Sequence, residues 1–167
     1  GEVLPASGDQ RDHVVARELV GSAAVLNGIA SHLVSATVAY AKERQQFGRL
    51  IGSFQGVKHL LADAFSKVEL ATTAARAATW RVAAADPDAL ASARLARICA
   101  VEAEFVANKV ALQVHGGIGF TFEHDLQLWL KRGKALEQSH GGRYQVARAA
   151  GLDAVASAQR AAQNEED

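Results

Sequence analysis

The sequence predicts an all-α domain: a four-helix bundle with long helices, followed by a short C-terminal helical hairpin. Alanine is abundant, and apolar residues recur at helical spacing along most of the chain. Proline, which interrupts helices, occurs only as Pro5 and Pro87. No segment shows the alternation of apolar and polar residues, bounded by turns, that indicates a strand.

The first helix is predicted over residues 12–44 and the second over residues 54–84, joined by a glycine-containing loop at 45–53. Ser53 is expected to cap the second helix. The apolar stripe of the first helix repeats every seven residues and consists of Leu19, Leu26 and Leu33, with Ala23, Ala30 and Thr37 beside them. The expected buried face of the second helix consists of Phe54, Val57, Leu61, Phe65 and Val68.

The third helix is predicted over residues 87–114, with Asp86 as its cap and Pro87 in its first position. It carries two apolar faces, so we expect it to be buried on more than one side. One face consists of Ile98, Phe105 and Leu112, and the other of Leu95, Cys99, Val106 and Val110.

Two shorter helices are predicted over residues 123–136 and 143–158, separated by Gly141-Gly142. The polar tail that follows residue 158 is expected to fray. The chain is therefore predicted to be one domain, 1–167, with an ordered core over about residues 12–158. Since it starts at Gly1 rather than Met, we expect it to be a piece of a longer protein.

The composition limits the classes of function. Eighteen basic and eighteen acidic residues give a formal net charge of zero, which leaves no basic excess for binding a nucleic acid. No uninterrupted apolar run is long enough to span a bilayer, and no His, Cys or acidic spacing predicts a metal site. The single cysteine, Cys99, is expected to be a buried free thiol, which favours a cytoplasmic location.

Two segments are unusual for a plain helical bundle. In the first, Arg44 ends a helix and is followed at once by Phe47 and Gly48. The guanidinium suits phosphate oxygens and the phenyl ring can stack on a ligand, although Arg44 could equally complement the helix dipole and Phe47 fill the core. In the second, the glycines of residues 115–119 expose backbone that can border an anion or a flavin, or can simply end the helix.

The two segments together resemble the C-terminal domain of the acyl-CoA dehydrogenase family. The resemblance rests on three patterns in their order and spacing: Tyr-Ala-x-x-Arg-x-x-Phe-Gly from Tyr40, Ile-Gly-x-Phe-Gln from Ile51, and Gln-x-x-Gly-Gly-x-Gly-Phe-x-x-Glu from Gln113. It covers about residues 14–158. It implies that the N-terminal helical and middle β domains of the family are absent from this chain.

The resemblance also implies cofactor, substrate and partners. It places Arg44 and Phe47 against the FAD of a neighbouring subunit, with Gln46 and Gln55 as further candidates for that surface. It places three residues beside the adenosine part of the flavin: Gln113, Gly116 and Gly117. The implied reaction is α,β-dehydrogenation of an acyl-CoA thioester in a homo- or hetero-oligomer, a dimer or a dimer of dimers, that shares FAD sites between subunits.

The catalytic base departs from the usual family pattern. The position at which most members carry the carboxylate corresponds to His140, and the alternative position on the first helix corresponds to Glu18. A desolvated carboxylate with a raised pKa suits removal of the proton alpha to the thioester, so Glu18 is the favoured candidate. His140 as the base, and a subunit with no base, remain open.

Three functions follow from these observations. The favoured one is an FAD-dependent acyl-CoA dehydrogenase whose activity requires the missing domains or a partner subunit. A flavin-dependent monooxygenase on the same fold would keep the flavin motifs and lose the carboxylate, as the His140 substitution permits. A non-catalytic subunit that completes a partner's FAD site is the third.

Overall fold

The computed structural model describes residues 8–121, 124–139 and 142–166. Its helices are α1 (Gly8–Glu43), α2 (Gln55–Ala83), α3 (Ala89–His115), α4 (Leu126–Gln138) and α5 (Gly142–Glu166). The connections contain a small antiparallel hairpin, β1 (Gln45–Gln46) and β2 (Arg49–Leu50), and two 3-10 turns, η1 (Ile51–Ser53) and η2 (Gly116–Phe120).

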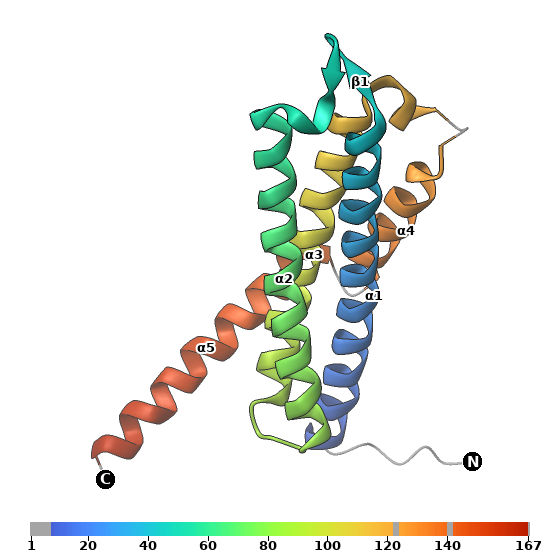
Figure 1. Ribbon diagram of the computed structural model, residues 1–167. Helices are drawn as coiled ribbons and strands as arrows, with labels where there is room; N and C mark the ends of the chain where they lie inside the picture. Colours follow the sequence, from blue (N-terminus) through green and yellow to red (C-terminus); the bar gives the residue numbers. More distant parts are fainter. Residues whose placement is uncertain (1–7, 122–123, 140–141, 167) are drawn as a thin grey trace, which may run out of the picture.

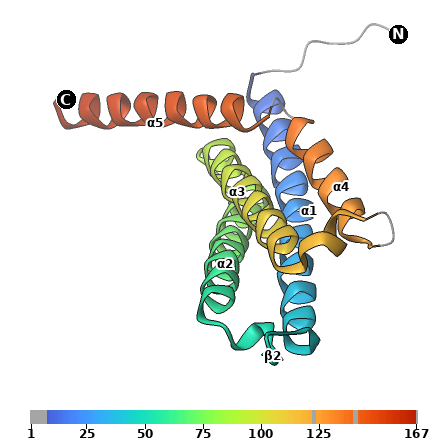
Figure 2. The same ribbon diagram turned by 90° about the horizontal axis from the view of Figure 1, so that it is seen from above.

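The long helices α1, α2 and α3 lie side by side, and the shorter α4 packs along α1 and α3 (Figure 1). The predicted all-α class is confirmed. Figure 2 shows α5 running away from the bundle, where an ion pair between Arg94 of α3 and Asp153 of α5 joins it to the rest. Contrary to the predicted frayed tail, α5 continues to Glu166, because alanine and glutamine there favour helix.

The core of the bundle is made largely of alanine. The predicted stripe of α1 is confirmed, since Leu26 and Leu33 are fully buried and Leu19 is nearly so. They face buried alanines that let the helix axes approach closely, namely Ala64, Ala71, Ala78, Ala93, Ala96, Ala100, Ala103, Ala107 and Ala111.

The predicted buried faces of α2 and α3 are partly wrong. Phe65 on α2 is 55% exposed, and Leu95 and Phe105 on α3 are 57% and 51% exposed. Because alanines occupy the positions between the helices, these larger side chains are left on the outer face. The outer surface of α2 and α3 therefore carries apolar groups that the chain itself does not cover.

Two predicted helix starts are also wrong. Ser53 does not cap α2: its hydroxyl donates to the Leu50 carbonyl, and α2 begins after Phe54 without a side-chain cap. Pro87 is not the first residue of α3, because the Asp86 carboxylate accepts the Asp88 N–H and shapes a turn that delays the helix to Ala89.

By length and composition alone, α1 could cross a membrane, contrary to the expectation from its sequence. Half of its most apolar window is buried inside the structure. A core helix of a packed bundle can have the same composition, and the buried apolar side chains of α1 pack against α2 and α3.

Candidate functional site

The hairpin that follows α1 presents the first predicted motif. Arg44 lies immediately after the last residue of α1 and is exposed. Strand pairing joins Gln46 to Arg49 and leaves Phe47 and Gly48 at the tip. Both tip residues have positive φ, 53° for Phe47 and 76° for Gly48, as a tight two-residue hairpin requires. Glycine adopts this conformation freely, whereas phenylalanine is strained in it.

The Phe47 side chain does not fill the core. It is 92% exposed and meets Phe54 only edge to face, with ring centroids 6.3 Å apart. Phe54 also contacts Arg49, whose guanidinium carbon lies over the Phe54 ring at 4.0 Å from its centroid. The hairpin thus holds Phe47 with a strained backbone and its ring in solvent. Without a ligand or partner, this conformation costs free energy.

The second motif forms a turn at the end of α3. The Gly116 N–H donates to the Leu112 carbonyl and ends the helix, with Gly116 at φ 62°. No atom lies within 4 Å of where a Cβ of Gly116 or Gly117 would stand, so the backbone here faces open space. A shallow hollow of about 480 Å³ lies over this turn and is lined by Lys109, Leu112, Gln113, Gly116, Gly117 and Phe120.

An aromatic stack joins the two motifs at one end of the bundle. Tyr40, in the last turn of α1, stacks on His115 at a centroid distance of 4.2 Å, and His124 meets the same imidazole edge to face at 4.8 Å. His115 is buried and its Nδ1 lies 2.8 Å from the Ala111 carbonyl. Burial lowers the pKa of His115, so the stack is built on a neutral ring.

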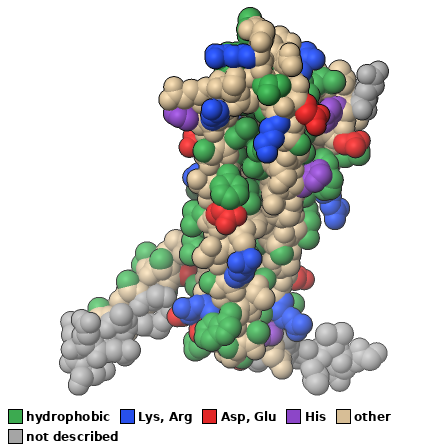
Figure 3. Space-filling model, in the orientation of Figure 1, with side chains coloured by type: hydrophobic (Ala, Val, Ile, Leu, Met, Phe, Trp, Pro, Cys, Tyr) green, Lys and Arg blue, Asp and Glu red, His purple; other side chains and the backbone are tan. Residues whose placement is uncertain are grey.

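The groups gathered at this end suit an anionic ligand with a planar ring. Arg44 offers a guanidinium for phosphate oxygens, Phe47 offers a stacking face, and Gln113 an amide beside the open glycine backbone. In the space-filling view, Lys and Arg side chains stand around this end, with hydrophobic groups among them (Figure 3). The donor set and the open backbone fit a flavin dinucleotide.

The remaining predicted cofactor residues differ in their surroundings. Gln46 is exposed on β1, and Gln55 is exposed at the start of α2, with its Nε2 3.5 Å from Nε2 of His59. Sequence reasoning gave Lys109 no role and used Phe120 only as part of the family pattern, although both line the glycine hollow. Lys109 lies one helical turn before Gln113 on α3, and this spacing could have revealed it.

The favoured base candidate is not at this end. Glu18 lies on the exposed side of α1, 26 residues before Arg44, which corresponds to roughly 39 Å along a helix. His140 lies outside the described residues. Glu137, in the last turn of α4, is only 14% exposed, but its carboxylate pairs with the Lys134 ammonium at 2.6 Å.

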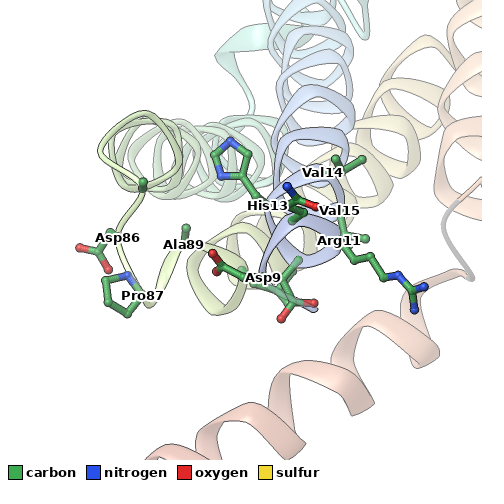
Figure 4. Close-up of a pocket in the computed structure, with 12 residues that line it drawn as sticks. Asp9, Arg11, His13, Val14, Val15, Asp86, Pro87 and Ala89 are labelled. Atoms are coloured by element: carbon green, nitrogen blue, oxygen red, sulfur yellow. The ribbon is translucent and has the colours of Figure 1, made fainter. Parts of the chain in front are cut away.

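A larger hollow, of about 1180 Å³, lies at the opposite end of the bundle, between the start of α1 and the turn that joins α2 to α3. Figure 4 shows His13 pointing into the space between α1 and that turn, with Asp86 and Pro87 across from it. None of the predicted cofactor residues lines it. Its size alone therefore does not mark it as the cofactor site.

Comparisons with known proteins identify the family and the fold. The family described as "Acyl-CoA dehydrogenase, C-terminal domain" matches residues 14–156. Acyl-CoA dehydrogenase IpdE2 of Mycolicibacterium smegmatis is 46% identical over 114 residues, 68% of this chain and 35% of the relative. Acyl-CoA dehydrogenase FadE34 of Mycobacterium tuberculosis is 40% identical over 141 residues, 84% of this chain and 19% of the relative. The chain thus spans about a third or less of these relatives.

Solved structures show the same fold. A chain of the ChsE4-ChsE5 complex from Mycobacterium tuberculosis superposes with a TM-score of 0.79 at 29% identity. The match covers 84% of this chain and 38% of that chain. The five helices described above are therefore similar to one part of a longer protein.

Proposed function

The chain belongs to the acyl-CoA dehydrogenase family, whose C-terminal domain it matches, and we propose that its hairpin end forms part of an FAD site. The whole enzyme would desaturate an acyl-CoA thioester between its α and β carbons. The single observation that carries the proposal is Phe47, held at positive φ with 92% of its side chain exposed, beside Arg44. Apart from its edge-to-face contact with Phe54, this ring is left in solvent, so it is suited to contact a ligand.

Each group has a role that its chemistry allows. The Arg44 guanidinium would bind the pyrophosphate through charge-assisted hydrogen bonds, and Phe47 would cover an aromatic face. Gln113 and the backbone of Gly116 and Gly117 would border the adenosine part, where the absence of side chains permits close approach. FAD, when bound, would accept a hydride from the β carbon of the acyl chain.

We further propose that this FAD site is completed by another subunit. The exposed stripe on the outer face of α3 runs from Phe105 through Lys109 towards the glycine hollow. A partner that covers Phe65 and Phe105 would extend to the hollow itself. The ChsE4-ChsE5 complex and a steroid acyl-CoA dehydrogenase made of Tcur3481 and Tcur3483 are related assemblies with two kinds of chain.

Glu18 is the proposed base. Glu18 lies on the exposed side of α1, so it needs the parts of the enzyme outside this chain to exclude water around its carboxylate. Because Glu18 and Arg44 are roughly 39 Å apart along α1, the two residues would serve different FAD sites of an oligomer. This separation supports an assembly in which each chain contributes to two sites.

FAD binding tests the cofactor proposal. We expect Arg44→Ala to weaken FAD binding by about 1.5–3 kcal/mol, the usual contribution of a hydrogen bond to a charged group. The matched control is Arg76→Ala, which removes an exposed arginine from the middle of α2. The measurement is FAD fluorescence during titration of the assembled protein, and equal affinities of the two variants would contradict the proposal.

Anaerobic flavin reduction by an acyl-CoA tests the base. In the assembled enzyme, Glu18→Gln should slow reduction by ~10²–10⁴-fold, as is typical for loss of a general base. FAD affinity should stay nearly unchanged, since glutamine keeps the shape of the side chain and Glu18 is proposed to act on the acyl chain rather than to hold the flavin. Reduction at the parental rate would exclude Glu18 from the mechanism.

A second candidate function is a non-catalytic subunit that completes a partner's FAD site. The exposure of Glu18 and the two-chain complexes among related structures favour it. It predicts stable co-purification with a homologous chain that carries its own carboxylate, and no effect of Glu18→Gln on turnover of that complex. Loss of turnover in the same complex would favour the dehydrogenase.

A further inference from the structure

The interface between α3 and α4 contains charged groups where a bundle normally has apolar ones. Arg97 is fully buried and Glu104 is 4% exposed, two turns apart on the same side of α3. Arg97 Nη2 donates to the carbonyls of Leu136 at 2.6 Å and Glu137 at 3.3 Å, in the last turn of α4. Arg97 therefore caps the carboxyl end of α4.

Glu104 occupies the space that a side chain at position 133 would fill. Gly133 is buried in the middle of α4, and a Cβ placed on it would overlap the Glu104 carboxyl group. The Asn108 amide donates to Glu104 Oε1 from one turn further along α3. The carboxyl group is thus enclosed by glycine backbone on one side and its own helix on the other.

The charges around this carboxyl group do not neutralise it. On α4, the Lys134 ammonium is already paired with Glu137 at 2.6 Å, and on α1 the His32 ring lies tilted against Trp129 of α4, with ring centroids 4.4 Å apart. Burial raises the pKa of Glu104 to about 7, and the Glu137 carboxylate adds to that rise, while Lys134 and the Asn108 amide oppose it. Near neutral pH the group can therefore gain or lose its proton.

We propose that the α3–α4 interface is a proton-dependent joint, in which α4 stays seated while the Glu104 carboxyl group under Gly133 is neutral and is loosened when that group ionises. An ionised carboxylate enclosed without a cation loses its hydration. Movement of α4 away from α3 restores water to it. The alternative, unfolding of the bundle, would also expose the alanine-rich core.

Movement of α4 would also affect the end of the bundle that carries the two motifs. The first residue of α4, Leu126, is 3% exposed and packs against Gly119 of the η2 turn. His124, just before it, contacts the buried His115 ring. The joint itself does not depend on the proposed function, but if that proposal holds, pH would alter the glycine hollow through α4.

Trp129 provides a reporter for the joint. The chain has two tryptophans, Trp80 and Trp129, so Trp80→Phe leaves only the one on α4. In this background, acrylamide quenching of Trp129 should increase as pH rises from about 5.5 to 8.5, with a midpoint near 7. Glu104→Gln, which keeps the shape and removes the charge, should abolish the change.

The His32 ring lies beside Trp129 in both the parent and Glu104→Gln, so the comparison of the two proteins separates any effect of that ring on the fluorescence from the effect of Glu104. An unchanged transition in Glu104→Gln would overturn the proposal. So would quenching of the Glu104-containing protein that is constant across this pH range.

A glycine substitution tests the same joint without titration. Gly133→Ala should increase Trp129 quenching at every pH, and adding Glu104→Ala should reverse the increase by making room for the methyl group. Gly151→Ala on α5, where a Cβ meets no atom within 4 Å, is the matched control and should change nothing. Parental quenching in Gly133→Ala would overturn the proposal even if Glu104→Gln failed to fold.

Discussion

Inside the bundle, Leu26 and Leu33 are fully buried against alanines of the neighbouring helices, whereas at the hairpin end Phe47 leaves 92% of its side chain in solvent at positive φ. The interior covers its large apolar side chains: the buried leucines of α1 lie in clusters with alanines of α2 and α3. The hairpin end does not, since its aromatic ring and its arginine face outward. This difference separates the residues that hold the fold from those available to a cofactor or a partner.

The largest effect expected on stability is in the interior. Leu33→Ala should lower the free energy of unfolding by about 2–5 kcal/mol, because the alanine-rich surroundings cannot close over the cavity. Urea unfolding followed by circular dichroism measures this change. A loss below about 1 kcal/mol would show that the helices shift to fill the space, and that the interior is less rigid than its packing indicates.

The next largest effect concerns Glu104, an ionisable side chain buried in an otherwise largely apolar interior. Its pKa is raised when folded, so its contribution to stability is fully present below pH 4.5 and is lost as pH rises through about 7. The shift from 4.5 to about 7 corresponds to at most about 3 kcal/mol. Between pH 4.5 and 8, the unfolding free energy of the parent should fall by up to that amount relative to Glu104→Gln.

His115 affects stability in the opposite sense. Because the pKa of the folded His115 is lowered, the protein loses stability as the pH falls below 6.5, the ordinary pKa of histidine. His115 is present in both the parent and Glu104→Gln, so its effect cancels in the difference between their unfolding free energies. Urea midpoints at several pH values supply the measurement. If the unfolding free energies of the parent and of Glu104→Gln change in parallel with pH, the assignment of a buried charge to Glu104 is wrong.

The smallest effect on stability is expected at the hairpin tip. Phe47→Gly should change the unfolding free energy by less than about 1 kcal/mol, since relief of the positive φ offsets the greater freedom of the unfolded glycine. FAD affinity of the assembled protein should nevertheless fall, by roughly 0.5–1.5 kcal/mol for a lost aromatic contact. A variant that loses stability but keeps its FAD affinity would reverse the roles assigned to the two regions.

The sequence predicted the helices well because their signals are local. The heptad of Leu19, Leu26 and Leu33 marks the buried stripe of α1 directly. The large apolar residues of α3 led to a wrong prediction of its buried face. Leu95 and Phe105 follow helical spacing, yet they face outward while alanines form the contacts. Spacing identifies a face of a helix, but it does not say whether the same chain covers that face.

The two motifs were recognised from the sequence, and the structure brings them to one end of the bundle, where the Tyr40–His115 stack joins them. The buried pair of Arg97 and Glu104 was missed, because a charged residue in a helix is expected on the surface. Its one local signal is Gly133, an isolated glycine in a helical pattern, which indicates close approach by another group. Only the packing of α4 on α3 shows that this group is a carboxyl.

The most direct test of the cofactor-facing end is a nitrogen–proton NMR titration of the chain with FAD, with riboflavin as the comparison. We expect chemical-shift changes confined to residues 44–48 and 113–120, larger with FAD than with riboflavin because the pyrophosphate meets Arg44. Residues 64–78 in the middle of α2 should not change. Shifts centred on the hollow around His13 and Asp86, or no shifts at the two motifs at millimolar FAD, would contradict the account.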